Sequence, residues 1–150
     1  MSYTSAKSRP SYTFDALLEF RDSYAATSSA AAEVDSAAKV VDLGTGYFAG
    51  DMVIDVTAAA VDGGDEAYKI GIEFSTTTGF SSGSEYEGPA LLIGDSSVTG
   101  GDADTTTGRY VLKFHNRVVD GTTARYARVY TTHIGSTSSI TFTAFASPAQ

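Results

Sequence analysis

Two histidines, His115 and His133, are the first residues to consider for catalysis or metal binding in this 150-residue chain. An imidazole can hold a metal ion or transfer protons near neutral pH. Neither histidine has a second histidine at the spacing of a metal site. Because His115 lies at the end of an expected strand and His133 in an expected turn, we predict structural or solvent-exposed roles for both.

Acidic residues gather beside two glycine pairs. Asp62, Asp65 and Glu66 flank one pair, and Asp102 and Asp104 follow the other. Their carboxylate oxygens are donors that calcium prefers, but the regular one-three-five spacing and the distant glutamate of a dedicated calcium loop are absent from the sequence. We therefore expect ordinary acidic turns, with no metal and no cofactor.

Three glutamates, Glu73, Glu85 and Glu87, are candidates for a paired-carboxylate hydrolase. Glycoside hydrolysis needs two carboxyl groups about 5 Å or about 6.5–9.5 Å apart, and nothing in the sequence places two of them so. No Gly-x-Ser-x-Gly elbow occurs, and the Gly-Thr-Gly step at residues 44–46 does not continue into a phosphate-binding pattern. The sequence predicts a protein that is not an enzyme.

Tyrosines offer a further kind of chemistry, because aromatic rings on a sheet face can stack against sugars. Tyr126 and Tyr130, with Tyr110 and Tyr68, are the candidates for such a platform. The chain has no tryptophan and must build its core from eight phenylalanines and nine tyrosines. Core or cross-strand roles for these tyrosines are therefore favoured over sugar binding.

Residues 108–145 indicate the elements that position these side chains. Three runs of alternating apolar and polar residues follow one another, separated by turn residues, as in consecutive antiparallel strands. One face of these runs carries Tyr110, Leu112 and Phe114, then Arg125, Ala127, Val129 and Thr131, then Ile140, Phe142 and Ala144. The pattern predicts an all-β domain.

The rest of the chain fits the same class. Residues 39–43 predict a strand, and the runs at 52–56 and 68–74, joined by an acidic glycine turn, predict a hairpin. Residues 14–24 predict a helical turn or an edge strand, and the Ala/Ser-rich residues 25–38 a surface crossing in preference to a helix. Residues 75–107 predict long loops around one or two short strands. Six to eight strands in all indicate an antiparallel β-sandwich of jelly-roll type.

The composition disfavours several classes of binding partner and location. The formal net charge of −8 disfavours nucleic acid, whose binders cluster lysine and arginine. The sequence contains no run of about 18 apolar residues, so it predicts no membrane span. Residues 1–10 lack the apolar segment of a secretory signal. Cysteine is absent, so packing and hydrogen bonds alone must hold the fold. We expect one domain made in a cytoplasm.

Four segments carry a resemblance to a known family. They read Leu-Leu-Glu-Phe-Arg-Asp at residues 17–22, Val-Val-Asp-Leu-Gly at 40–44, Ala-Arg-Tyr-Ala-Arg-Val-Tyr at 124–130 and Thr-Phe-Thr-Ala at 141–144. In order and spacing, over residues 15–147, the chain resembles the jelly-roll capsid cement (decoration) proteins of tailed bacteriophages. It departs from that pattern in its N-terminal arm and in a Ser/Gly/Asp insertion around residues 94–107.

The resemblance implies a structural virion protein on the outer capsid surface, made in the host cytoplasm. Such proteins cement neighbouring major capsid subunits against internal pressure, form small homo-oligomers (a dimer or a trimer) and have no catalytic residues. We expect residues 1–14 to be a flexible N-terminal arm and residues 15–150 the jelly-roll domain. The arm residues predicted to contact the capsid or a sister subunit are Tyr3, Lys7, Arg9, Tyr12 and Phe14.

A carbohydrate-binding β-sandwich module is the alternative. It would use the tyrosines and the acidic loops on glycans, and Tyr86 and Tyr126 are the residues whose substitution would then remove binding.

Overall fold

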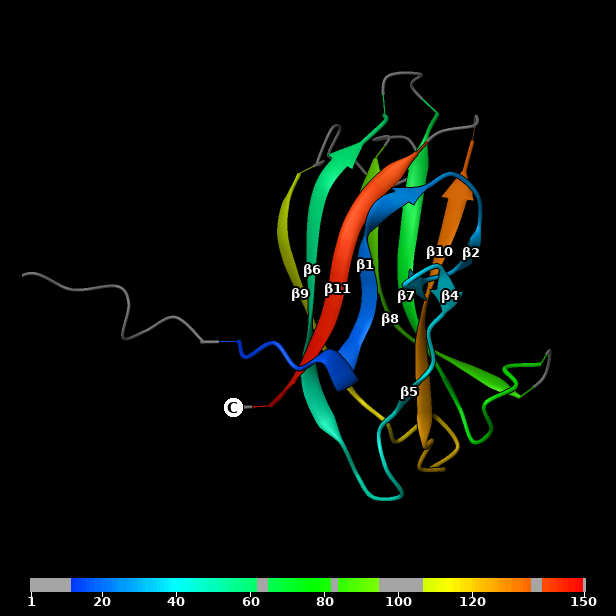
Figure 1. Cartoon of the computed structure of the whole chain (residues 1–150). Helices are drawn as coiled ribbons and strands as arrows, with labels where there is room; N and C mark the ends of the chain where they lie inside the picture. The colour runs from blue at the N-terminus through cyan, green and yellow to red at the C-terminus, as the bar shows by residue number, and fades with distance from the viewer. Residues whose placement is uncertain (1–11, 62–64, 82–83, 95–106, 136–138, 150) are drawn as a thin grey trace, which may run out of the picture.

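Antiparallel sheets packed against each other make up nearly all of the computed structural model, which describes residues 12–61, 65–81, 84–94, 107–135 and 139–149. The predicted all-β sandwich is confirmed. Figure 1 shows the two layers side by side. One layer, sheet A, contains in spatial order β1 (Glu19–Ala26), β11 (Ile140–Pro148), β6 (Ala49–Ala59) and β9 (Gly108–His115).

The second layer, sheet B, contains in spatial order β2 (Ala30–Ala31), β10 (Tyr126–Ile134), β7 (Ala67–Ser75) and β8 (Glu85–Gly94). The short strand β5 (Val41–Asp42) also pairs with β10. The 3₁₀ turn η2 (Ala16–Leu18) precedes β1, and the carboxylate of Asp15 caps it by accepting from the backbone N–H of Leu17.

At the edge of sheet B beside β10, two short strands take the place of one continuous strand. Strand β2 pairs with the Tyr130 end of β10 and β5 with the Tyr126 end. Between them, the hairpin of β3 (Glu33–Val34) and β4 (Ala37–Ala38) leaves the sheet. Asp35 and Ser36 form its tip with positive φ angles of 53° and 63°, the geometry of a tight hairpin turn. The predicted surface crossing of residues 25–38 is thus built from short strands, without a helix.

Strands pair in a nested order when β2 and β5 are counted as one. The first strand pairs with the eighth (β1 with β11) and the second with the seventh (β2 and β5 with β10). The third pairs with the sixth (β6 with β9) and the fourth with the fifth (β7 with β8). The strand order is therefore 1-8-3-6 in sheet A and 2-7-4-5 in sheet B.

This order corrects two expectations. The runs at 52–56 and 68–74 are not a hairpin, because β6 belongs to sheet A and β7 to sheet B. Strands β9, β10 and β11, which follow one another in residues 108–145, alternate between the sheets and do not pair together. A turn can carry the chain across the sandwich as readily as back along one sheet, so turn signals alone do not identify the partner strand.

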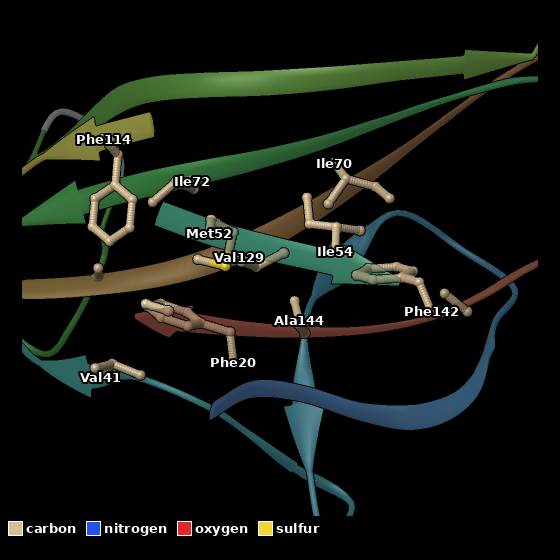
Figure 2. Close-up of a cluster of buried hydrophobic side chains, with 14 of the residues drawn as sticks. Phe20, Val41, Met52, Ile54, Ile70, Ile72, Phe114, Val129, Phe142 and Ala144 are labelled. Carbon is tan, nitrogen blue, oxygen red and sulfur yellow. The ribbon is translucent and has the colours of Figure 1, made fainter. Parts of the chain in front are cut away.

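The core lies between the sheets. Alternate residues of β6, β11, β7 and β10 point inward and are buried, as the period-2 pattern predicts. Figure 2 shows side chains from both layers meeting, with Phe142 and Ala144 from one side and Ile70 and Val129 from the other. In the part of the chain that the structure describes, no helix is long and apolar enough to cross a membrane.

Asn116 ties together the loops at one end of the sandwich. Its side chain is fully buried. Its Nδ2 donates to the carbonyl oxygens of Gly46 and Ala124, each at 2.9 Å, and its Oδ1 accepts from the backbone N–H of Phe48 at 2.8 Å. One amide therefore satisfies three backbone groups, two from the segment between β5 and β6 and one from the segment between β9 and β10.

Replacing this amide should destabilise the fold. We expect Asn116→Ala to lower the free energy of unfolding by about 2–4 kcal/mol, because three backbone groups lose their partner in a buried place. Urea denaturation measures the change. Thr122→Ala, on the same loop, serves as a control and should cost less than about 1 kcal/mol. Equal stability of Asn116→Ala and the unsubstituted protein would contradict the role given to this side chain.

Candidate interaction surface

An apolar row crosses the outer face of sheet A. Phe145 on β11, Val53 on β6 and Val111 on β9 are direct cross-strand neighbours. Val53 lies between the inward-facing Met52 and Ile54, so it points away from the core, yet it is fully buried. Val111 is 38% exposed. The row is therefore a second, partly uncovered apolar site on the outside of the sandwich.

Two ion pairs flank the apolar row. On one side, Nε and Nη2 of Arg109 donate to the two carboxylate oxygens of Asp55, both at 2.7 Å. On the other side, Nζ of Lys113 lies 3.3 Å from Oδ1 of Asp51. The hydrogen bonds to Asp55 raise the pKa of Arg109 above its ordinary value. An apolar centre with a charged rim is the usual anatomy of a protein–protein interface.

The described start of the chain lies beside this row. The ring of Phe14 packs edge-on against that of Phe145, with centroids 5.5 Å apart, while Phe14 remains 55% exposed. Leu17 in η2 is 78% exposed. Tyr12 is half-buried and close enough to Arg109 to add to the rise in its pKa. In Figure 1 this blue segment passes near the C-terminal end of β11.

The two ends of the described chain also enclose a hollow of about 400 Å³. Its lining comes from Thr13, Asp15, Leu18, Ser147, Pro148 and Ala149. We define the outer apolar surface as Phe14, Leu17, Val53, Val111 and Phe145. It carries exposed large side chains next to an open hollow, which is a shape that another protein chain can fill.

Part of this surface was predicted from the sequence. Tyr12 and Phe14 were predicted as partner-binding residues and lie on it or beside it, and their role in binding stays a prediction. Tyr3, Lys7 and Arg9, predicted with them, lie outside the described residues. Val111 was missed, although a signal existed, since it is an apolar residue on the face that otherwise carries Arg109, Lys113 and His115. Leu17 carried no comparable signal.

The histidines are far apart in the fold. His115 is at the end of β9, opposite the beginning of β6, and its ring lies 6.0 Å from that of Tyr47. His133 is opposite the beginning of β7, and its ring lies edge-on to that of Tyr68 at 5.1 Å. Because β6 and β7 follow each other in the chain and begin at opposite ends of the sandwich, the structure does not bring the histidines together.

The acidic turns are only partly described. Asp65 is exposed and Glu66 is buried, while Asp62, Asp102 and Asp104 lie outside the described residues. Within the described ranges, no group of three or more histidine, aspartate or glutamate side chains is arranged to hold a metal ion.

The three glutamates lie on β7 and β8, where Glu73 is the cross-strand neighbour of Glu87 and Glu85 that of Ser75. Glu73 accepts from Nε of Arg128 at 2.7 Å, and both side chains are about four-fifths buried. Glu87 lies 3.4 Å from Nζ of Lys69. The cross-strand pair of carboxylates is thus already engaged by two cations on the outer face of sheet B.

The tyrosines divide between the core and this outer face. Tyr68 is fully buried and donates from its hydroxyl to backbone carbonyls, and Tyr110 packs against the core. Tyr126 and Tyr130 alternate with inward-facing residues of β10, so they share the outer face of sheet B. Tyr86 donates its hydroxyl to Asp120 at 2.9 Å. Core roles therefore hold for two of the four candidate platform tyrosines.

An ion pair holds the β5 end of the interrupted edge strand. Arg125 donates from Nε and Nη2 to Asp42, at 2.9 and 2.7 Å. These bonds, with that from the backbone N–H of Gly44, lower the pKa of Asp42 from 3.8 to about 2. The guanidinium of Arg125 also lies 5.3 Å from the ring centroid of Tyr126.

Comparison with known proteins identifies no relative: no protein family, no curated protein and no solved structure matches this chain.

The Asp42 pKa gives a direct test of the Arg125 contact. An NMR titration should place the pKa of Asp42 near 2, and Arg125→Gln should move it toward the usual value of about 3.9. Because the pKa is lower in the folded state, the stabilisation is present above about pH 4 and disappears as the pH falls toward 2. An Asp42 pKa that is the same in both proteins would contradict the observed geometry.

Proposed function

We propose that this protein is a capsid cement protein that binds the outer surface of a tailed-bacteriophage shell and joins neighbouring major capsid subunits. The observation that carries the proposal is the outer apolar surface, where Phe14, Leu17 and Val111 remain exposed beside the start of the chain. Covering such side chains with a partner stabilises the complex by removing apolar area from water. A module that contacts two subunits raises the cost of separating them.

The strand order supports the proposed family. Pairing the first strand with the eighth, and so on inward to the fourth with the fifth, wraps two Greek keys into two facing sheets. That is the arrangement of jelly rolls, which occur in viral capsid and lectin domains. We therefore propose the jelly-roll type for this sandwich, as the resemblance of residues 15–147 implies.

Homo-oligomerisation follows from the same proposal. In this proposal, part of the outer apolar surface contacts a sister subunit, and the arm, with Tyr3, Lys7 and Arg9, contacts the capsid. Copies on a symmetric shell would then gain from multivalent attachment, since binding at one contact raises the effective concentration at the next.

Substitutions on the outer apolar surface test the capsid role. We expect the double variant Phe14→Ser, Leu17→Ser to bind capsids at least about tenfold more weakly, because two exposed apolar anchors are lost. Co-sedimentation with shells assembled from the major capsid protein of the same source measures binding and its ratio. Leu92→Ser is the matched control, since Leu92 is an exposed leucine (48%) on the opposite sheet.

The same experiment contains the outcomes that would overturn the proposal. Unsubstituted protein that does not sediment with capsids at a fixed ratio, or capsids that gain no heat resistance from it, would exclude the cement role. Equal binding by the double variant, the control and a protein lacking residues 2–14 would exclude this surface and the arm as the contact. Unchanged thermal unfolding of the variants confirms that they remain folded.

A second candidate function has one observation in its favour. On the outer face of sheet B, the missing side chain of Gly71 leaves a hollow of about 90 Å³ beside Tyr130, Lys69 and Glu73. Aromatic rings next to paired charges can stack on a sugar and bond its hydroxyls. If the protein binds carbohydrate, we propose that this hollow is the binding site.

Glycan-array binding tests this alternative. If it holds, Tyr130→Ala should remove binding, because the ring that bounds the hollow is lost, whereas Val111→Ser on sheet A should leave it unchanged. Capsid co-sedimentation should then be negative. An array without any bound glycan would dismiss the carbohydrate function.

A further inference from the structure

Strand β9 is an open edge of sheet A, and Figure 1 shows it at the margin of its layer. Among the described residues it pairs with β6 alone, so its other side has no partner strand. The pairing runs from Gly108 to His115 without a register shift, and β9 contains no proline. Backbone groups along a regular edge are a template for another strand, and proteins usually block them. Strand β9 therefore remains able to accept a further strand.

The other sheet edges carry such blocks. At the opposite edge of sheet A, the pairing of β1 with β11 shifts register on both sides of Arg21, which is only 2% exposed. In sheet B, the edge strands β2 and β5 have two residues each. Strand β8, at the far edge of sheet B, has a register shift and contains Pro89, which has no N–H to donate. Within the described residues, β9 is the edge that is both long and regular.

The pairing with β6 shows which backbone groups of β9 point to the open side. The N–H of Asn116 donates to the carbonyl of Phe48 at 3.0 Å, and these two residues continue the β6–β9 register by one step. Alternate residues of an antiparallel strand direct their backbone groups to the same neighbour. Even-numbered residues of β9 therefore face β6. The odd-numbered residues, which direct their N–H and C=O groups to the open side and are all exposed, are Arg109, Val111, Lys113 and His115.

The core is incomplete beside this edge. Tyr110 and Leu112 pack against the core from β9 but are only half-buried, as is Leu91 on β8. Inward residues of the central strands of sheet A, such as Ile54 and Phe142, are fully buried. A strand added to β9 would cover part of Tyr110 and Leu112 and remove that apolar area from water.

Two copies of β9 can pair with each other in a register that uses all four open residues. In an antiparallel pair with Leu112 on the twofold axis, Arg109 lies opposite the partner's His115, and Val111 lies opposite the partner's Lys113. Opposite residues of this kind exchange two hydrogen bonds, so the four pairs make about eight. With Val111 on the axis instead, Arg109 would lie opposite the partner's Lys113, and like charges directly opposite each other are destabilising. The register centred on Leu112 is therefore favoured.

The charges on β9 allow this approach. Arg109 and Lys113 are already paired with Asp55 and Asp51 on β6, so each cation is partly neutralised within its own copy. A lysine on an edge strand usually discourages pairing. In the register centred on Leu112, however, Lys113 faces a valine, and no lysine or arginine lies opposite another across the axis.

We propose that β9 pairs with β9 of a second copy of this chain, antiparallel and with Leu112 on the twofold axis. The two copies of sheet A then form one sheet of eight strands, four from each copy. Exposed sheet edges recognise other strands in this way, and a twofold contact uses the same surface of both copies. The proposal rests on the homo-oligomer of the proposed function, whose interface it specifies, and its tests need no capsid.

Amide hydrogen exchange tests the pairing directly, at protein concentrations below and above the dissociation constant that sedimentation velocity gives. We expect the four open N–H groups of β9, from Arg109 to His115, to exchange at least about tenfold more slowly at the higher concentration, because only the dimer gives them acceptors. The N–H groups of Tyr110 and Leu112 should be protected at both concentrations, since they face β6.

Proline at the open edge tests the contact by substitution. Lys113→Pro removes one open N–H and adds a ring at the edge but leaves the backbone groups that face β6 unchanged, so it should weaken dimerisation at least about tenfold. Lys113→Ala loses the same side chain but keeps the N–H, and its dissociation constant should stay within about threefold of that of the unsubstituted protein. Thermal unfolding shows whether both variants remain folded.

A single cysteine tests the register, because the chain has no cysteine of its own. In the proposed dimer the two Leu112 positions lie opposite each other, with Cα atoms about 4.5 Å apart, a separation that a disulfide can span. Leu112→Cys should therefore form a disulfide-linked dimer under mild oxidation, whereas Leu18→Cys, the matched change of a half-buried leucine in η2, should not. This test does not depend on the folding of the proline variant.

The proposal is overturned if the protein stays monomeric at all concentrations, or if it dimerises while the four open amides still exchange fast. Equal dissociation constants for Lys113→Pro and Lys113→Ala, or a Leu112→Cys protein that does not cross-link, would also reject it. Amide protection that is independent of concentration and disappears when residues 2–11 are deleted would make the arm of the same chain the occupant of the edge, in place of a second copy. A protein that dimerises as expected but does not sediment with capsids would reject the capsid role and support this interface.

Discussion

The mutual burial of two sheet faces is the constraint on which the rest of this structure depends. The chain has no cysteine, so no disulfide assists the core, and the inward side chains of β6, β11, β7 and β10 are almost completely buried. Because side chains alternate along a strand, fixing the inward set also fixes the outward set. Val53 and Arg128 point outward for this reason. The residues on both outer faces are those that the inward-facing pattern leaves over.

Period-2 alternation predicted the faces of strands but not their partners. Tyr110, Leu112 and Phe114 point inward as expected, and so do Ile140, Phe142 and Ala144. The assumed hairpin of residues 52–74 was wrong, since an apolar face can pack across the sandwich as well as beside a neighbour. Residues 75–107 were predicted to form long loops around one or two short strands, but β8 is ten residues long. Its Gly88 and Pro89 interrupt the alternation that would have indicated a strand of this length.

Arg21 and Phe14 show why the edge of sheet A and the candidate surface were harder to predict than the fold. In strict alternation, burial of Phe20 would place Arg21 outside, and only the register shifts against β11 turn it inward. Those shifts depend on which strand β1 meets, which the sequence alone does not determine. The contact of Phe14 with Phe145 likewise joins residues from opposite ends of the chain. Both features arise from contacts between segments that are far apart in the sequence, so the local sequence does not predict them.

The two outer faces offer different chemistry to a partner. On sheet B, Arg128 already bonds Glu73 and lies 4.5 Å from the ring of Phe80, so a partner would have to displace contacts within the protein. Val111 on sheet A and Phe14 and Leu17 just before β1 are exposed, and covering them removes apolar area from water. The flanking pairs of Arg109 and Lys113 can stay in place as a polar rim. A protein partner would therefore gain more by covering the outer face of sheet A than that of sheet B.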